Sequence, residues 1–211
     1  MGKKLVLTIA MLSFLLLASG AMGSVSVGVK QGDWIEYNVT TTGTPADGHD
    51  VTWARMEVLS VQGPEISVNI TTKATNGTFT SGVQTLNLEL GQVGIWAIIP
   101  ANLGVGEAFF DAEIGNVTIQ GEEEKTFAGA TRTTTYASTT ERFKRWDKAT
   151  GVFVEGVDTL ADYNLTATVD KTNIWSQSPT AVDSTLFYVL LAGTAVAVAA
   201  IVIIIVVRRR K

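Results

Sequence analysis

The uncharged segment at residues 186–207 limits most strongly what this chain can fold into. It contains 22 residues, mostly Val, Ile, Ala and Leu. At about 1.5 Å per residue, a helix of that length measures roughly 33 Å, which is enough to cross the ~30 Å hydrocarbon core of a bilayer. An uncharged run this long is improbable as a buried core helix. We therefore expect a transmembrane helix here.

Charges and small residues at the two ends set the predicted orientation. The tail at residues 208–211 is Arg-Arg-Arg-Lys, and such cations stay on the cytoplasmic side. At the other end, Lys3 and Lys4 precede a mainly apolar run of 13 residues, too short to span a bilayer, and then Ala21-Met22-Gly23. This pattern is typical of a cleaved signal peptide.

The chain is thus predicted to be a single-pass protein of the cell membrane, with its N-terminal domain outside, its C-terminus cytoplasmic and membrane lipid as its first partner. The predicted segments are a signal peptide (1–23), an extracellular β domain (24–175), a linker (176–185), the transmembrane helix (186–207) and a basic tail (208–211).

Charge and cysteine content restrict the partners of the external part. It carries 10 Lys and Arg against 20 Asp and Glu, a net charge of −10. Such a surface repels nucleic acid, so no nucleic-acid partner is expected. There are no cysteines, and a domain of about 160 residues buries enough surface to fold without disulfides.

Alternating apolar and polar residues predict β-structure throughout the external domain. Residues 34–41 and 65–73 alternate cleanly, and Pro and Gly separate the short runs. We expect an all-β fold: a single antiparallel sandwich or curved half-barrel of about 9–11 strands. The solid apolar run at residues 95–99 is interpreted as a buried strand or short helix.

Two short sequences predict tight turns. Asn76-Gly77 favours a type I′ hairpin, in which both central residues need positive φ. The acidic run Glu122-Glu123-Glu124 is interpreted as a solvated hairpin tip in preference to a cation site.

Sequons for N-glycosylation are more frequent than composition predicts. Five of the eight Asn are followed by x-Thr, where about two would arise by chance. The five are Asn38, Asn69, Asn76, Asn116 and Asn164. Four fall on the polar face of their own alternating strand and Asn76 falls in a predicted turn, so a glycoprotein is expected.

Catalytic and cofactor signatures are missing from the sequence. His49 is the single histidine, there is no cysteine nucleophile, and no common hydrolase or phosphate-binding motif occurs. Asp111 and Glu113 could share a cation, but they lack the further ligands of a calcium loop. We therefore expect no catalytic residue, no metal and no cofactor.

The five tryptophans have two interpretations. They could line a sugar or lipid groove, but in a sandwich or barrel they more often fill the core. Trp53 and Trp175 are the candidates for ligand-facing aromatics.

Three motifs resemble those of uncharacterised archaeal membrane-anchored surface proteins. Residues 32–37 (GDWIEY) are similar to their G-D-W-x-x-Y start, residues 99–107 (IPANLGVGE) to an I-P-x-x-L-x-V-G-[DE] loop, and residues 145–155 (RWDKATGVFVE) to a W-D-x-x-T-G hairpin. The resemblance covers about 26 residues and implies a fold and a location, without carrying over any catalytic residue. In the hairpin, Asp147 is expected to cap the turn and Gly151 to take the left-handed conformation.

The same hairpin pattern is similar to that of lipoprotein-carrier-like half-barrels, which bind lipid on their concave face. Three hypotheses follow. The first is a non-enzymatic surface glycoprotein that binds or assembles with an envelope protein or glycan. The second is a half-barrel that binds or carries a lipid or lipid-linked glycan. The third is an envelope hydrolase that uses an unrecognised carboxylate pair.

Overall fold

The computed structural model describes residues 25–45, 48–94 and 96–176. The predicted signal peptide, transmembrane helix and basic tail lie outside the described residues, as does the linker beyond Ser176. Within the described ranges, no helix is long and apolar enough to cross a membrane.

The described residues form eleven β-strands and no helix. The strands are β1 (Trp34–Gly43), β2 (Val51–Gln62), β3 (Glu65–Ala74), β4 (Phe79–Asn87), β5 (Ala108–Asp111), β6 (Gly115–Thr118), β7 (Gly121–Phe127), β8 (Ala130–Ser138), β9 (Arg142–Asp147), β10 (Phe153–Thr159) and β11 (Tyr163–Thr172). The prediction of an all-β fold is confirmed.

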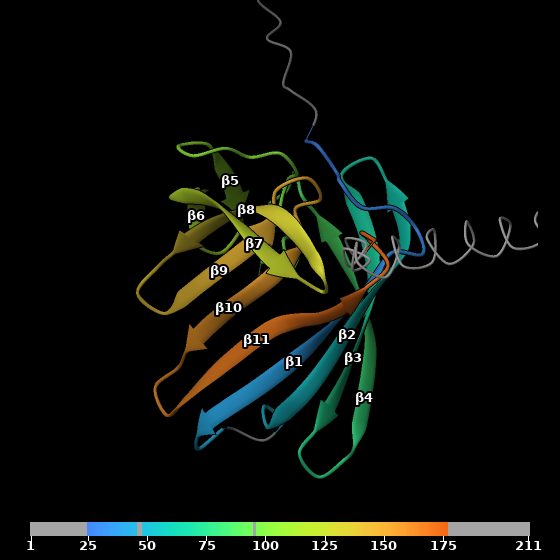
Figure 1. The fold of residues 1–211 in the computed structure, drawn as a ribbon, viewed down its shortest axis with the longest axis vertical. Coiled ribbons are helices and arrows are strands. Elements are labelled where there is room, and N and C mark those ends of the chain that lie inside the picture. Colours follow the sequence, from blue (N-terminus) through green and yellow to red (C-terminus); the bar gives the residue numbers. More distant parts are fainter. Residues whose placement is uncertain (1–24, 46–47, 95, 177–211) are drawn as a thin grey trace, which may run out of the picture. The chain divides into compact units, whose positions relative to one another are not determined.

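Nine of the strands make one antiparallel sheet, in the order β4-β3-β2-β1-β11-β10-β9-β8-β7 (Figure 1). The pairing of β1 with β11 joins the first and last strands at the middle of the sheet. The other neighbours are consecutive along the chain, so short hairpins build both halves. Strands β5 and β6 form a separate hairpin.

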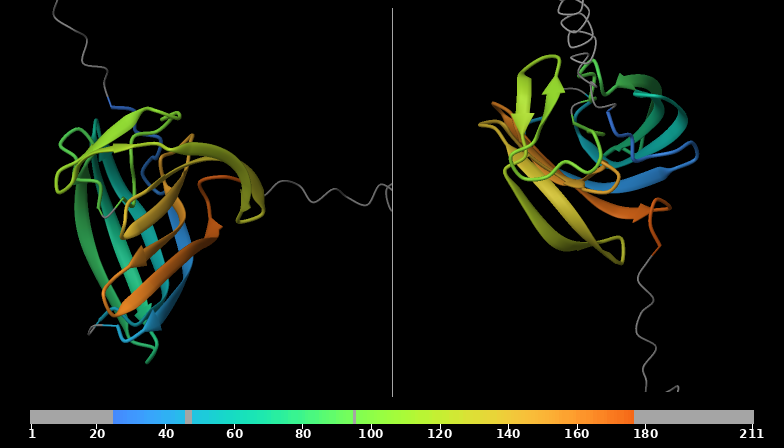
Figure 2. Two further views of the ribbon diagram at one scale, coloured as in Figure 1. Left: turned by 90° about the vertical axis from the view of Figure 1, so that its left-hand side faces the viewer. Right: turned by 90° about the horizontal axis from the view of Figure 1, so that it is seen from above.

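The large sheet bends strongly, so one of its faces is concave (Figure 2). Alternation along the strands assigns side chains to that face: Ile35, Tyr37 and Val39 point inward from β1, and Met56 and Val58 point inward from β2. All five are buried in the hydrophobic core. The period-2 apolar pattern of the sequence is therefore the pattern of this concave face.

The connection between β4 and β5 packs inside the curve of the sheet. Trp96, Ile98 and Ile99 are fully buried there. Backbone bonds tie the connection to the β9–β10 hairpin, because Phe153 N donates to Ala97 O and Ile99 N to Gly151 O. The expected burial of this segment is confirmed, but the expected strand or helix is wrong, because residues 96–99 belong to neither. Trp96 has a positive φ of 64°, which interrupts both.

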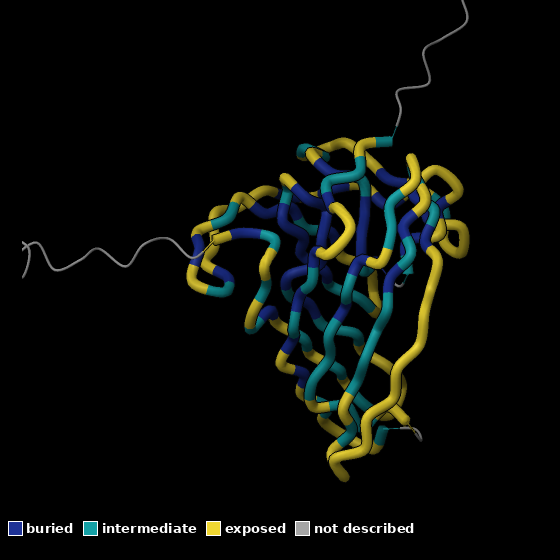
Figure 3. The backbone as a smooth tube through the Cα atoms, turned by 90° about the vertical axis from the view of Figure 1, so that its right-hand side faces the viewer, coloured by how far each residue is buried: buried dark blue, intermediate teal, exposed yellow. Residues whose placement is uncertain are grey.

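Burial differs between the two ends of the sheet (Figure 3). The end that holds the β4–β5 connection is largely buried. The tube becomes half-buried and then exposed toward the opposite end. Val51 at the start of β2 and Leu165 near the start of β11 are only half-buried. Among the described residues, the β4–β5 connection thus fills one end of the concave face, and none covers the other end.

Two predicted turns differ from the observed ones. Asn76-Gly77 does join β3 to β4, but Gly77 alone has positive φ (86°), so the turn is not type I′. Gly77 N instead donates to Ala74 O, as in a type I turn followed by a left-handed glycine. Glu122–Glu124 is not a hairpin tip: these residues lie within β7, and the turn to β8 comes at Ala128-Gly129. The short strand β5 was not predicted.

The β9–β10 turn has the two features expected of it. Gly151 has a φ of 72°, and Asp147 accepts bonds from Thr150 N and Thr150 Oγ1 at 3.1 and 2.7 Å. A Cβ atom at Gly151 would overlap the carbonyl oxygen of Ile99 in the β4–β5 connection. This glycine therefore serves both the turn and the packing of the connection on it.

Replacing Gly151 by alanine should destabilise the domain more than the same change at Gly77. Both glycines have positive φ, and an L-residue there costs about 1–2 kcal/mol. Gly77 has open space around it, whereas Gly151 adds the overlap with Ile99, so we expect about 3 kcal/mol or more for Gly151→Ala. Thermal unfolding of a fragment ending at Ser176 measures the loss of stability in each variant. Equal melting temperatures for the two variants would contradict this packing.

Candidate functional site

Small side chains line the middle of the concave face. Strand register places Val39, Ala167, Gly156 and Lys144 in one row across β1, β11, β10 and β9. The neighbouring row runs through Thr72, Ala54, Tyr37 and Val169. Ala54, Ala167 and Gly156 have small or no side chains, so they leave space above the middle of the concave face. Larger residues there would fill that space.

A cavity of about 230 Å³ occupies this place, and we call it the trough. Its lining is almost wholly apolar and comes from both halves of the sheet and from the β4–β5 connection. The lining residues are Tyr37, Val39, Val51, Ala54, Thr72, Ala97, Lys144, Phe153, Leu165 and Ala167. Of these, Lys144 is the one charged residue.

Lys144 reaches the trough over Gly156. A Cβ atom at Gly156 would lie 2.8 Å from Lys144 Cδ, so the glycine makes room for the lysine stem. The ammonium bonds Asp158 at 2.7 Å and lies 4.8 Å from the centre of the Phe153 ring. Arg142 Nε donates to the other oxygen of Asp158 at 3.1 Å. The side chain of Lys144 is 8% exposed, so this ion pair is largely removed from water.

Burial lowers the pKa of Lys144, because the charged amine loses its hydration. The attraction and hydrogen bond of Asp158 oppose that shift, whereas Arg142 reinforces it. A buried lysine that pairs with Asp158 is thus held beside an apolar cavity.

Tyr37 anchors the floor of the trough. Its hydroxyl donates to Phe153 O at 3.0 Å, and its ring lies 5.5 Å from the Phe153 ring. Burial raises the pKa of Tyr37 well above its usual range, so the phenol stays neutral. The side chain gives the trough a rigid apolar base, without an ionised oxygen.

The carboxylates Asp111 and Glu113 border a second hollow, of about 340 Å³, together with Arg142. Asp111 is buried and fully used by the fold: it accepts bonds from Trp96 Nε1 at 2.6 Å and from Glu113 N at 2.8 Å. These bonds fix the Trp96 ring and the β5–β6 turn. Among the described residues, no group of three His, Asp or Glu is placed to hold a metal ion.

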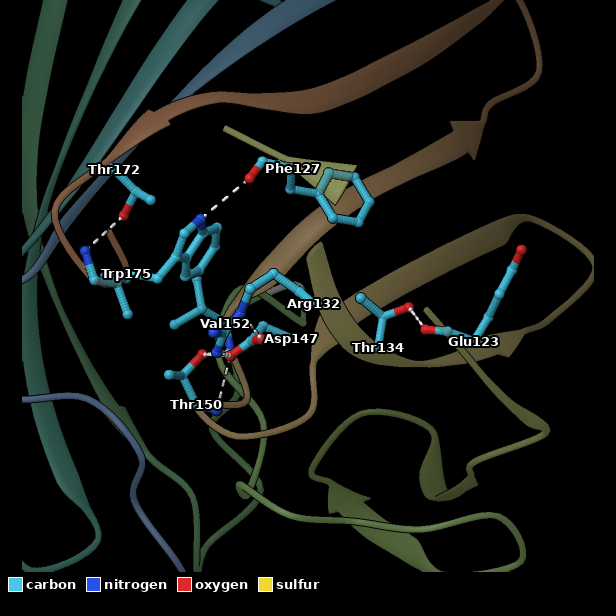
Figure 4. A network of polar contacts seen from close by, with 10 residues as sticks. Glu123, Phe127, Arg132, Thr134, Asp147, Thr150, Val152, Thr172 and Trp175 are labelled. Carbon is cyan, nitrogen blue, oxygen red and sulfur yellow. Dashed lines mark hydrogen bonds and ion pairs between the residues drawn. The ribbon is translucent and has the colours of Figure 1, made fainter. Parts of the chain in front are cut away.

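The two candidate aromatics lie away from the trough. Trp53 points outward from β2, in register with Asn38 and Lys73, and packs edge-on against Phe79 at 6.2 Å. Trp175 is buried and donates from Nε1 to Phe127 O at 3.2 Å (Figure 4).

Arg132 links Trp175 to the β9–β10 turn. Its guanidinium lies 5.1 Å from the centre of the indole ring and forms two bonds with Asp147 (Figure 4). Asp147 thus binds Arg132 on one side and caps its own turn on the other. This places Trp175 in a structural network that fastens the last described residues to the sheet.

The sequons lie where the strand alternation predicts. Asn38, Asn76, Asn116 and Asn164 are exposed. Asn69 is half-buried, and its side-chain oxygen accepts a bond from Ser81 Oγ at 2.9 Å. None of the five lines the trough.

Neither Lys144 nor the trough was apparent from the sequence. Alternation along residues 142–146 puts Arg142, Lys144 and Trp146 on one face. Trp146 is a core residue, so a signal existed: two cations share the inward face of their strand. The sequence does not show which strand pairs with residues 142–146. Only the observed pairing places Gly156 opposite Lys144, where its missing side chain leaves room for the lysine.

No protein-family model matches this sequence, and no curated protein sequence matches it. Among solved structures, the chain is similar to one described as "The Siderocalin Ex-FABP functions through dual ligand specificities". Sequence identity is 12%, the alignment covers 78% of this chain and 86% of the other, and the TM-score is 0.26. At that score the likeness supports no inference about this chain.

Replacing exposed sequon residues should remove mass from the mature protein without unfolding it. Asn38→Gln and Asn164→Gln change surface side chains, which usually alters stability by less than ~0.5 kcal/mol. Thr40→Ala disrupts the first sequon without touching its Asn, so it should remove the same mass as Asn38→Gln. Intact-mass spectrometry makes the comparison, and masses that differ from the parent only by the substituted side chains in all three variants would contradict glycosylation at these two sites.

Proposed function

We propose that the external domain binds a single-chain lipid in the trough, as an open half-barrel anchored at the cell surface. The observation that carries the proposal is the apolar cavity of about 230 Å³ on the concave face. Pockets for drug-sized ligands measure roughly 300–1,000 Å³, so this cavity suits one narrow apolar chain. Binding without catalysis is the proposed activity.

Two features support a chain-like ligand. The trough extends to the open end of the sheet, where its lining residues Val51 and Leu165 are only half-buried. Covering apolar surface contributes about 25 cal/mol per Å², so an acyl or isoprenoid chain laid there would be stabilised along its length. A compact polar ligand would gain little from such walls.

The proposed location adds to this. A cleaved signal peptide would export the domain, and a transmembrane helix at residues 186–207 would hold it beside the membrane, which is also the source of a lipid ligand. Exposed sequons would keep the outer face of the domain in water.

A second candidate function is assembly with another envelope protein, and one observation favours it. The edge strand β4 carries no charge and no proline, and its Phe79 and Val83 are 60% and 66% exposed. Uncharged edges of this kind are open to pairing with another strand.

Filling the trough should abolish lipid binding, and adjacent residues of β11 provide a matched pair of variants. Ala167 faces the trough, whereas Thr168 faces outward and is exposed. We expect Ala167→Trp to lower labelling by a photoactivatable long-chain alcohol roughly tenfold or more, and Thr168→Trp to leave it unchanged. Labelling is measured on the full chain in isolated membranes, with labelled peptides mapped by mass spectrometry.

Within residues 25–176, labelled peptides should come from the inner-facing residues of β1, β2 and β11, apart from any label on the proposed transmembrane helix. Labelling confined to the outer face of β2–β4, or equal labelling of both tryptophan variants, would contradict lipid binding in the trough and favour assembly through β4.

A further inference from the structure

Two cations meet one carboxylate beside the trough. Lys144 and Arg142 both pair with Asp158, one at each oxygen, at 2.7 and 3.1 Å. The three charges sum to one positive charge in excess. Lys144 alone of the three lines the trough, and its ammonium lies 4.8 Å from the centre of the Phe153 ring, which lines it as well.

The hydrogen bond to Asp158 does not occupy all the N–H donors of Lys144. An ammonium group has three N–H donors, and among the described residues Asp158 is its one hydrogen-bond partner. Arg142 also holds Asp158, so that carboxylate keeps a partner if the ammonium turns partly toward a second anion.

The surroundings make an anion the fitting ligand group. The other trough residues are uncharged, and the Lys144 side chain is largely shielded from water. A charge in such a place interacts much more strongly than one at an exposed surface. A neutral or cationic polar group would leave the excess charge without a partner.

We propose that the lipid held in the trough carries a single negative charge at its polar end, and that Lys144 binds this end. A carboxylate and a phosphodiester share the required chemistry. This inference rests on the proposed function and specifies its ligand class. The apolar chain would run from Lys144 past Ala167 and Leu165 toward the open end.

Competition among ligands with equal chains tests the headgroup. The full chain in lipid nanodiscs is labelled with the photoactivatable long-chain alcohol, which is neutral. Decanoic acid, decyl methyl phosphate, decanol and decyltrimethylammonium are then added as competitors. At least one anionic competitor should displace the label at concentrations about tenfold or more below decanol, as expected for a bond to a charged group. The stronger of the two anions identifies the headgroup.

Charge variants should move this preference in opposite directions. Lys144→Met removes the ammonium at similar length and should abolish the preference for anions while decanol still competes. Asp158→Asn frees both cations and should strengthen the preference several-fold. Lys171→Met, on an exposed side chain of β11, is the control and should change nothing. If Lys144→Met does not fold, Asp158→Asn still tests the proposal.

The outcomes separate the two proposals. If the alcohol labels the trough but anions compete no better than decanol, or if Lys144→Met keeps the preference, the charged-headgroup inference is overturned and lipid binding stands. If the alcohol does not label the trough of the unmodified protein, the proposed function itself fails.

Discussion

The contact between Trp96 and Trp146 determines which part of the concave face is filled by the β4–β5 connection. Trp146 donates from its indole to Trp96 O at 2.8 Å, and Trp96 donates from its own indole to Asp111 at 2.6 Å. Both rings are fully buried. Burying two such rings contributes several kcal/mol, which exceeds the ~1–2 kcal/mol that the left-handed backbone of Trp96 costs. The packed and hydrogen-bonded tryptophans fix the β4–β5 connection at one end of the sheet. The trough lies on the part of the concave face that this connection does not fill.

The charges beside the trough follow from strand pairing. Lys144 on β9 pairs with Gly156 on β10, and Asp158 lies two residues further along β10. Because Gly156 has no side chain, the lysine stem crosses over it to reach Asp158. A buried ion pair is weak support for stability, since desolvation of both groups opposes their attraction. The ion pair therefore does not by itself account for the stability of the fold, and we propose that it serves binding.

The sequence was informative wherever local pattern decides structure. Alternation located most of the strands, and it assigned Asn38 and Asn164 to the exposed face. The turn at Asp147 and Gly151 was accessible because its chemistry is local. The β4–β5 connection was not, because positive φ at Trp96 is stabilised by distant partners. Glu122–Glu124 likewise lie within a strand because β7 pairs with β8 there, and Lys148 and Arg145 from elsewhere in the fold pair with Glu122 and Glu123. The trough was hidden for the same reason: Ala167, Gly156 and Lys144 are ordinary strand residues until register sets them in one row.

The most direct test of a lipid-binding trough is a crystallographic density map of the protein isolated from its own membranes. The account predicts elongated density along the concave face beside Tyr37 and Leu165, ending within hydrogen-bond distance of Lys144 Nζ. A trough that contains only ordered water, or that is closed by side chains of β1, β2 and β11, would contradict it.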